Sequence, residues 1–334
     1  MRKEEILFYL KNSDTEKELF KKADRTRKKF CGDEVYIRGI INFSNYCCRS
    51  CLYCGLRKNN RRIRRYRMKP EEIIGVAREI VNLGVRTIVL QSGDDFYYTR
   101  NMICWIIKKI KEMGDVAVTL SLGERPLEDY RAWKEAGADR YLLKHETANA
   151  KLYAKLHPYQ SLRKRIKLLY MLKKMGYQIG AGNIIGLPGQ TLEDLVDDIL
   201  LLRDLDVDMA GIGPFIPQRD TPLGNFPKGR LDLTLRVLAL SRIVTKNVLL
   251  PATTALATLD PENGQLLGLK VGANVIMPDF TPDDYIEEYL IYDNKARVTL
   301  KKAEETVLKA GRKISKKRGD SLKCTGHQKA FVYT

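Results

Sequence analysis

The chain has 334 residues, of which 44% are apolar, and a formal net charge of +18. This composition lies outside the range of disordered proteins and allows a large hydrophobic core. No apolar run reaches the roughly 18 residues that a transmembrane helix needs, and the charged start lacks the apolar segment of a secretory signal, so we expect a cytoplasmic protein with no membrane partner.

Short strands that alternate with helices are the recurring pattern of the chain, after a helical N-terminal extension at residues 1–30. Strands are expected at 35–44, 87–93, 117–123, 140–147, 179–186, 209–216, 250–257 and 273–279. Helices are expected at 70–82, which opens with Pro70 and two glutamates, and at 191–203, which opens with a near capping box. Glycines that end helices before the next strand are Gly84, Gly114, Gly137 and Gly176.

The strict β-then-α order predicts the fold class. Eight such units favour an α/β fold with a complete (β/α)8 TIM-type barrel at 31–300 over an open doubly wound sheet. A short basic tail, 301–334, is expected to pack on or near the barrel. The alternative is an incomplete barrel with a separate C-terminal lobe.

Positive charge is concentrated in two stretches. Residues 57–69 contain eight basic residues and no acid, and residues 301–318 contain eight basic residues and two glutamates. Such stretches attract nucleic acid, acidic proteins or anionic substrates, or they form a solvated surface. Because no RNA-binding motif accompanies them, nucleic acid is not the expected partner.

Four of the seven cysteines fall within eight residues: Cys47, Cys48, Cys51 and Cys54. This crowding is typical of a metal or cluster site in a reducing compartment rather than of a disulfide framework. From Cys47 the spacing is Cys-x3-Cys-x2-Cys, in the loop after the first expected strand. In a barrel this loop lies at the C-terminal face, where active sites lie. Three thiolates can hold three irons of a 4Fe–4S cluster and leave the fourth iron open.

Other uses of these cysteines fit less well. A zinc site needs four ligands, and Cys31, Cys104, Cys324 and the histidines show no paired spacing that would complete one. The last three cysteines of the group also have ferredoxin spacing, but no Cys-Pro follows. We therefore expect Cys48 not to be a ligand.

The spacing resembles that of the radical S-adenosylmethionine (SAM) superfamily. The resemblance implies that the amino and carboxylate groups of SAM bind the open iron. An electron from the reduced cluster then breaks a carbon–sulfur bond, which gives methionine and a 5′-deoxyadenosyl radical.

Polar residues on the strands predict a polar barrel cavity. Strand 140–147 places Arg140, Lys144 and Glu146 on one face, and three charges there cannot pack against apolar groups without partners. Glu146 is expected to accept hydrogen bonds from the SAM amino group and Arg165 to pair with its carboxylate; an internal ion pair of Glu146 is the alternative. Polar or small residues on other strands are Gln91, Gly93, Thr119, Ser121, Thr253 and Thr254. His157 has no evident partner and is expected at the surface or in the core.

Longer stretches across residues 32–282 resemble the HydE family of FeFe-hydrogenase maturases. Examples are GDEVYIRGIINFSNYC, WKEAGADRYLLKHETAN, GLPGQTLEDLVDD and GANVIMP. The resemblance implies a complete barrel and a radical directed at a sulfur-containing substrate, a cysteine-bound iron carbonyl cyanide complex. It also implies an electron donor such as ferredoxin or flavodoxin, and contact with other hydrogenase maturases.

Carried over residue by residue, the resemblance implies that Cys47, Cys51 and Cys54 bind the cluster. The implied SAM-binding residues are Tyr53, Gly93, Ser121, Glu146 and Arg165. The implied substrate-binding residues are Gln91, Thr119, Arg140, Lys144, Thr253, Thr254 and Met277. Lys144 stands where the family is expected to have arginine, and a lysine cannot bind an anion through two parallel hydrogen bonds as an arginine can. Some members carry a second cluster on three C-terminal cysteines; only Cys324 remains here, which predicts a single cluster.

Related reactions remain as alternatives. Methylornithine synthase and biotin synthase share the layout, so a radical SAM mutase or sulfur-insertion enzyme stays open. A tRNA-modifying radical SAM enzyme is a further alternative that the charge of +18 allows, and a plain electron carrier would hold a cluster without cleaving SAM.

Overall fold

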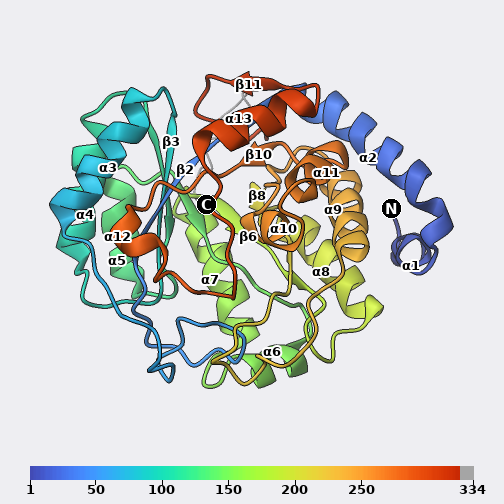
Figure 1. Ribbon diagram of the computed structural model, residues 1–334, viewed down its shortest axis with the longest axis horizontal. Helices are drawn as coiled ribbons and strands as arrows, with labels where there is room; N and C mark the ends of the chain where they lie inside the picture. The colour runs from blue at the N-terminus through green and yellow to red at the C-terminus, as the bar shows by residue number, and fades with distance from the viewer. Residues whose placement is uncertain (324–334) are drawn as a thin grey trace, which may run out of the picture.

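Parallel strands form the centre of the molecule, with helices around them, in a computed structural model that describes residues 1–323 (Figure 1). Six strands pair side by side in chain order. They are β2 (Gly39–Ser44), β3 (Thr87–Ser92), β4 (Ala117–Ser121), β5 (Arg140–Leu142), β6 (Gln178–Ala181) and β8 (Met209–Ala210). Every neighbouring pair is parallel, as successive strands joined by helices require.

The parallel pairing continues beyond this sheet and returns to its first strand. β1 (Glu34–Ile37) pairs with both β10 (Val275–Ile276) and β11 (Lys313–Ser315). Single parallel bridges complete the circuit at Met209–Leu249, Pro251–Val275 and Ile40–Asp279. The predicted α/β fold is thereby confirmed as a parallel sheet of six strands, which single bridges extend towards a barrel.

Some strand predictions need correction. The run 35–44 divides into β1 and β2, and the runs 179–186 and 209–216 each divide in two, adding β7 (Ile184–Ile185) and β9 (Gly213–Pro214). The strand predicted at 250–257 is wrong in its second half: only a parallel bridge at Pro251 remains of it, and α10 (Thr254–Leu259) begins inside the predicted range. Pro251 has no N–H to continue a ladder, and the Ala-Leu-Ala sequence that follows favours a helix.

The helices follow the predicted order. Those around the strands are α3 (Pro70–Asn82), α4 (Arg100–Lys111), α5 (Leu127–Glu135), α6 (Ala150–Leu156), α7 (Leu162–Lys174), α8 (Leu192–Asp204), α9 (Leu231–Thr245), α10, α11 (Gly264–Lys270), α12 (Asp283–Ile286) and α13 (Leu300–Lys309). The helix at 70–82 is confirmed, and the helix at 191–203 is confirmed with a shift of one residue. Thr191 caps α8, because its hydroxyl accepts from Asp194 N at 3.1 Å and the Asp194 carboxylate accepts from Thr191 N at 2.8 Å.

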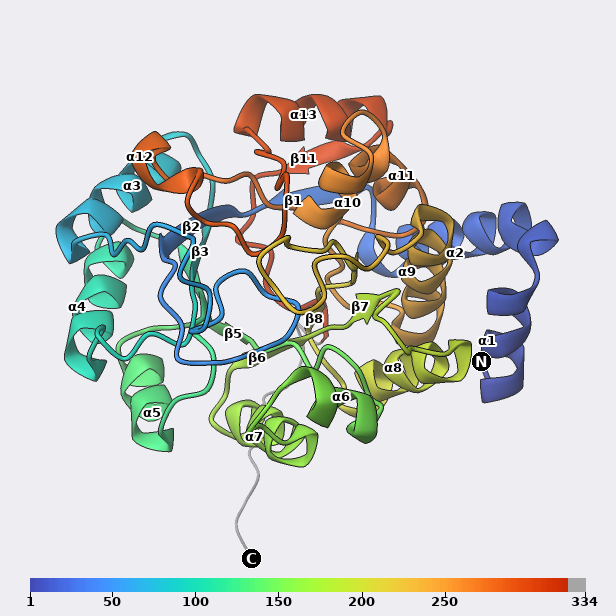
Figure 2. The same cartoon turned by 60° about the horizontal axis from the view of Figure 1, so that its bottom comes forward.

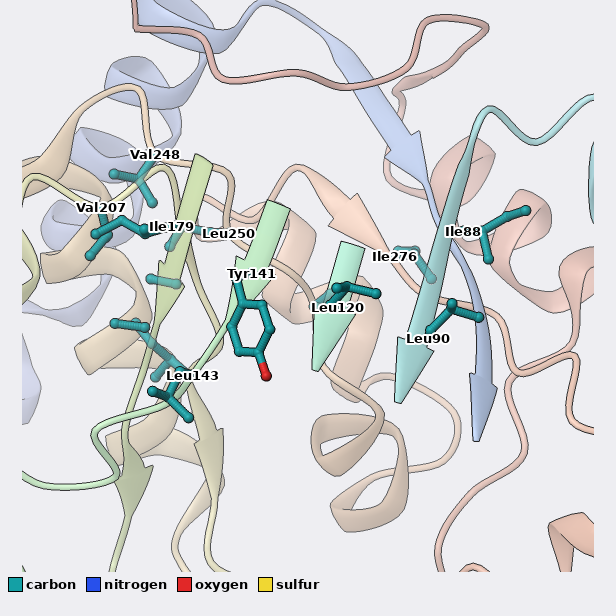
Figure 3. Close-up of a cluster of buried hydrophobic side chains, with 14 of the residues drawn as sticks. Ile88, Leu90, Leu120, Tyr141, Leu143, Ile179, Val207, Val248, Leu250 and Ile276 are labelled. Atoms are coloured by element: carbon teal, nitrogen blue, oxygen red, sulfur yellow. The ribbon is translucent and has the colours of Figure 1, made fainter. Parts of the chain in front are cut away.

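Alternate strand residues separate the core from a central cavity. One set belongs to the main hydrophobic cluster, which also contains helix residues: Ile88, Leu90, Leu120 and Tyr141 (Figure 3). Their sequence neighbours line the cavity instead: Val89, Gln91, Thr119, Ser121 and Leu142. The apolar side of each strand therefore packs towards the helices, and the polar positions are left for the interior.

The N-terminal extension lies outside the barrel. It consists of α1 (Lys3–Lys11), a 3-10 turn and α2 (Glu16–Cys31). α2 packs on α9, and α1 packs on α8 and α9, at the edge of the molecule (Figure 1). Within residues 1–323, no helix combines the length and apolarity that crossing a bilayer requires.

Residues 316–323, which we term the C-terminal strap, cover the N-terminal ends of the strands. The Arg318 carbonyl accepts from Thr87 Oγ1 at 2.6 Å and from Arg140 Nη2 at 2.9 Å. The Gly319 carbonyl accepts from Arg38 Nη2 at 3.1 Å. Because Thr87 and Arg140 begin β3 and β5, the strap closes the end of the barrel opposite to the cysteine loop.

The prediction that Arg140 lines the substrate cavity is wrong. Its side chain is fully buried outside the cavity, and its guanidinium donates to Gln178 Oε1, Thr87 Oγ1 and Asp320 Oδ1, the last at 2.7 Å. Strand alternation correctly placed Arg140 on the same face of β5 as Leu142. Arg140 is, however, the first residue of β5, at the end of the barrel that the strap covers. The cavity wall on this strand starts at Leu142.

Asp320→Asn should lower the free energy of unfolding by about 2 kcal/mol, because the buried Arg140 guanidinium loses its carboxylate partner. Asp283→Asn is the matched control, since its partner Arg297 is exposed and the pair contributes less than about 0.5 kcal/mol. Urea unfolding of both variants measures the difference. Equal losses in the two variants would contradict this role of the strap.

Candidate active site

A cavity of about 380 Å³ lies inside the ring of strands and opens towards the loop between β2 and α3. Its wall contains every predicted site residue except Arg140, namely Cys47, Cys51, Tyr53, Cys54, Gln91, Gly93, Thr119, Ser121, Lys144, Glu146, Arg165, Thr253, Thr254 and Met277. A second hollow of about 440 Å³ lies outside, beside Arg62 and Asp293, and contains no cysteine. The predicted chemistry therefore belongs to the inner cavity.

Cys47, Cys51 and Cys54 bring three free thiols to one wall of this cavity. The backbone amides of Arg49 and Asp94 each donate to Cys47 Sγ at 3.4 Å, and Gln160 Nε2 donates to Cys51 Sγ at 3.6 Å. Such N–H donors stabilise sulfur that carries negative charge, as cluster-ligating thiolates do.

Burial alone disfavours thiolates at these positions. It raises the pKa of Cys47 to about 12 and that of Cys51 to about 11, and it also raises the pKa of Cys54. A thiolate here therefore needs a positive partner within the cavity, which the irons of a bound cluster provide. The three thiols and their N–H donors fit a 4Fe–4S cluster.

A single metal ion fits less well. No three His, Cys, Asp or Glu side chains within residues 1–323 are grouped as the ligands of one ion would be. A 4Fe–4S cluster, by contrast, spreads its ligands over separate irons. Cys48 is exposed and does not line the cavity. Cys324, on which the single-cluster prediction rests, lies outside the described residues.

Arg65 fixes the shape of the cysteine loop. Its guanidinium donates to backbone carbonyls of Asn45, Leu56, Arg57 and Asn60. No carboxylate in the described part of the chain forms an ion pair with it. A loop without helix or strand thus obtains its hydrogen bonds from one cation next to the thiols.

Glu146 has two features that are typical of a functional residue. Its φ of 65° is unusual for a residue other than glycine, and its Oε2 is buried without a hydrogen bond. Lys144 Nζ lies 3.0 Å from Oε2, so the internal ion pair that was the alternative for Glu146 is present, although without hydrogen-bond geometry. The Thr119 and Thr253 hydroxyls are also buried without partners. A polar ligand in the cavity would satisfy all of these atoms.

Arg165 is held by neighbours that the sequence reasoning missed. Its Nε donates to Glu124 Oε1 at 2.7 Å, and its other nitrogens donate to the Lys144 carbonyl and to Gln160 Oε1, both at 2.9 Å. Arg49 joins the same network by pairing with Asp94 and Glu124. Asp94 follows β3 and Glu124 follows β4. Their positions directly after predicted strands could have indicated that they belong to the active site.

Arg38 is another cavity residue that the sequence reasoning missed. It lies between β1 and β2, lines the cavity, and leaves Nε buried without a hydrogen bond. Burial lowers its pKa well below the ordinary value. Its charge in the otherwise apolar run VYIRGII was the signal in the sequence.

The expectation for His157 was incomplete: it is buried, but it has partners and lines the cavity. Its Nδ1 donates to the Tyr153 carbonyl at 3.1 Å, since a carbonyl can only accept. Its Nε2 lies 2.9 Å from the Tyr53 hydroxyl, which must then be the donor to a neutral ring. His157 thereby fixes the orientation of the Tyr53 side chain.

Gly93→Ala should lower the cluster content of the protein severalfold. A Cβ at this position would lie 2.3 Å from the Tyr46 carbonyl oxygen and 2.6 Å from Cys47 Cβ, so the cysteine would have to move. Gly75→Ala is the matched control, because its Cβ meets no atom within 4 Å and α3 gains helix propensity. Iron per chain after anaerobic reconstitution measures the effect; full iron content in Gly93→Ala would contradict the close approach.

Stability should fall as the pH falls through the titration of His157. Burial, reinforced by Arg165, lowers its pKa to about 4, whereas the unfolded chain titrates near 6.5. The unfolded state binds the extra proton between these values, so acidification through this window costs about 3 kcal/mol. The free energy of unfolding, measured with urea between about pH 7 and 4.5, should depend less on pH in His157→Asn than in the wild type. Tyr53→Phe, which keeps the histidine, should retain the steep profile; equal slopes for all three proteins would contradict the assignment.

Comparisons with known proteins agree with this geometry. The profile of the Radical SAM superfamily matches residues 41–202. The FeFe hydrogenase maturase subunit HydE of Thermotoga maritima is 57% identical over 277 residues, which cover 83% of this chain and 79% of the relative. The 3-methylornithine synthase of Methanosarcina acetivorans is 28% identical over 289 residues, covering 86% and 81%.

Among solved structures, methylornithine synthase (PylB) has a TM-score of 0.85 at 26% identity and covers 94% of each chain. Its fold therefore matches the whole barrel rather than the cysteine loop alone. The 57% identity to HydE over most of both chains decides the family. The chain belongs to the HydE family of FeFe hydrogenase maturases, within the radical SAM superfamily.

Proposed function

We propose that Cys47, Cys51 and Cys54 hold a single 4Fe–4S cluster with which this enzyme cleaves SAM in hydrogenase maturation. The observation that carries the proposal is that three free thiols meet Glu146 around one cavity, where its Oε2 has Lys144 as ion-pair partner but accepts no hydrogen bond within residues 1–323. The cluster and SAM together supply a 5′-deoxyadenosyl radical when bound. The protein supplies the placement, the charges and the exclusion of water.

The residues around Glu146 would hold SAM. The Oε2 atom of Glu146 is an acceptor for the SAM ammonium group, and Lys144 is close enough to compete for it. Arg165 offers positive charge for the SAM carboxylate while Glu124 and Gln160 keep it in position. Tyr53, oriented by His157, and Ser121 complete this part of the wall, and Gly93 keeps the cysteine loop close to it.

The remaining polar wall would hold the substrate, a sulfur-containing, cysteine-bound iron carbonyl cyanide complex. Lys144 gives a mobile point charge for anionic groups, and the Thr119 and Thr253 hydroxyls lack partners within the described residues. Gln91 is anchored on the Tyr289 hydroxyl at 3.1 Å. Thr254 and Met277 complete this part of the lining. Other maturases would supply the substrate or accept the product.

A carbon radical requires that water and stray C–H groups be kept away. The C-terminal strap closes one end of the barrel, and the cysteine loop lies over the other. The closely spaced free cysteines fit a reducing compartment such as the cytoplasm.

Alanine at Cys47, Cys51 or Cys54 should remove the cluster and abolish SAM cleavage, because two thiolates cannot hold it. Cys48→Ala is the matched control and should keep about four irons per chain and full activity. Iron and sulfide analysis measures both. About eight irons per wild-type chain, or cluster loss in Cys48→Ala, would contradict the assignment.

The function is tested by anaerobic incubation of the reduced, reconstituted enzyme with SAM and the cysteine-bound iron complex. Release of methionine together with adenosyl transfer to sulfur supports the proposal. Conversion of an amino acid carbon skeleton instead would favour a mutase like the methylornithine synthases that this chain resembles. Intact SAM under reducing conditions would refute radical SAM chemistry.

A further inference from the structure

The basic stretch after the cysteines is exposed directly beside them. We term Lys58, Arg61, Arg62 and Arg64 the basic rim; all four are exposed. Arg62 pairs with Asp220 at 2.8 Å and Arg64 with Glu288 at 3.1 Å, yet their side chains remain 80% and 72% exposed. Lys58 and Arg61 form no ion pair with any residue in 1–323.

Backbone contacts hold this rim against the cysteine segment. Arg57 N donates to the Cys54 carbonyl at 3.1 Å, and Lys58 N donates to the Arg49 carbonyl at 2.7 Å. The Ser50 hydroxyl donates to Asn59 Oδ1 at 2.9 Å. Figure 2 shows this loop, in blue, crossing in front of the strand ends. The exposed cations therefore belong to the same loop as the three thiols, and these contacts hold them close to the cysteine segment.

An exposed aromatic residue lies on the neighbouring loop. Tyr159 is 97% exposed and has a φ of 66°, which is unusual for a bulky residue. The next residue, Gln160, donates to Cys51 Sγ, and Leu52 N donates to the Leu156 carbonyl at 2.9 Å, which joins the two loops. Tyrosine and arginine are enriched where proteins bind one another, so this loop adds an anchor to the charged surface.

Three cations of the second basic stretch serve a structural purpose. Arg312 pairs with Asp24 and Asp33, Lys317 with Glu34, and Arg318 with Asp115 and Asp139. These cations join the tail to the barrel and the N-terminal extension. Within residues 1–323, Lys58 and Arg61 of the basic rim form no such ion pair, which leaves their charge available for a partner.

We propose that the basic rim and Tyr159 form the docking surface for an acidic protein that carries one electron, a small iron–sulfur or flavin carrier. The inference rests on the proposed function, because a cluster on the three thiols gives the carrier its acceptor. In each encounter the carrier is oxidised by one electron and the cluster is reduced by one, without bond formation between the proteins. Opposite charges steer such encounters and make them sensitive to salt.

The test compares two double charge reversals with the same change in net charge. Lys58→Glu with Arg61→Glu alters the rim; Lys301→Glu with Lys309→Glu, on exposed positions of α13, is the control. A flavodoxin of net negative charge is titrated into each reconstituted enzyme at about 50 and 300 mM salt. The rim variant should raise the Kd about tenfold at low salt and lose most of the salt dependence, and the control should stay within about twofold.

Two further measurements make the result decisive. SAM cleavage driven by reduced flavodoxin should fall in the rim variant, while cleavage driven by dithionite should stay at the wild-type rate. Tyr159→Ala should weaken flavodoxin binding about threefold and leave its salt dependence intact. Equal binding by the rim variant, equal weakening in the control, or tight binding of RNA in place of flavodoxin would overturn the docking surface. Failure of dithionite-driven cleavage in every protein would instead count against the proposed function.

Discussion

The proposed cluster requires three sulfur atoms to carry negative charge inside one cavity, and this requirement is the central constraint on the site. Burial raises the pKa of Cys47 and Cys51, so the thiolate form is costly until positive charge and N–H donors surround it. The loop that carries these thiols has no helix or strand of its own. Arg65 gathers its carbonyls, and Gly93 allows β3 to approach Cys47. The cysteine motif functions only on this scaffold.

The two ends of the barrel have different roles because polarity is distributed along each strand. At the N-terminal ends, the strap satisfies Arg140 with Asp320 and closes the interior. On the cavity side, Glu146, Thr119 and Thr253 have buried oxygen atoms that make no hydrogen bond within residues 1–323. Buried groups of this kind are costly in an empty protein, so their place is where a ligand will bind.

The net charge of +18 likewise divides into two parts. In the C-terminal region, Arg312, Lys317 and Arg318 are paired with acids from the barrel and the N-terminal extension. Cations beside the cysteines are largely solvated, and the carbonyls of their own loop fix their position. The same residue types thus stabilise the fold in one place and leave a charged surface in the other.

The sequence by itself determined the fold class, the cysteine triad and the polar side of the strands, because periodicity and spacing are local properties. The sequence misled in two places. Residues 250–257 were predicted as a strand, because threonines fit a strand or a helix start equally well. Arg140 was assigned to the cavity, because strand alternation shows which face a residue is on but not how far along the barrel axis it lies. Only the tertiary structure brought Asp94, Glu124, Gln160 and His157 to the site, since their contacts join loops distant in sequence. Such long-range pairing depends on how the strands close into a ring, which no local pattern encodes.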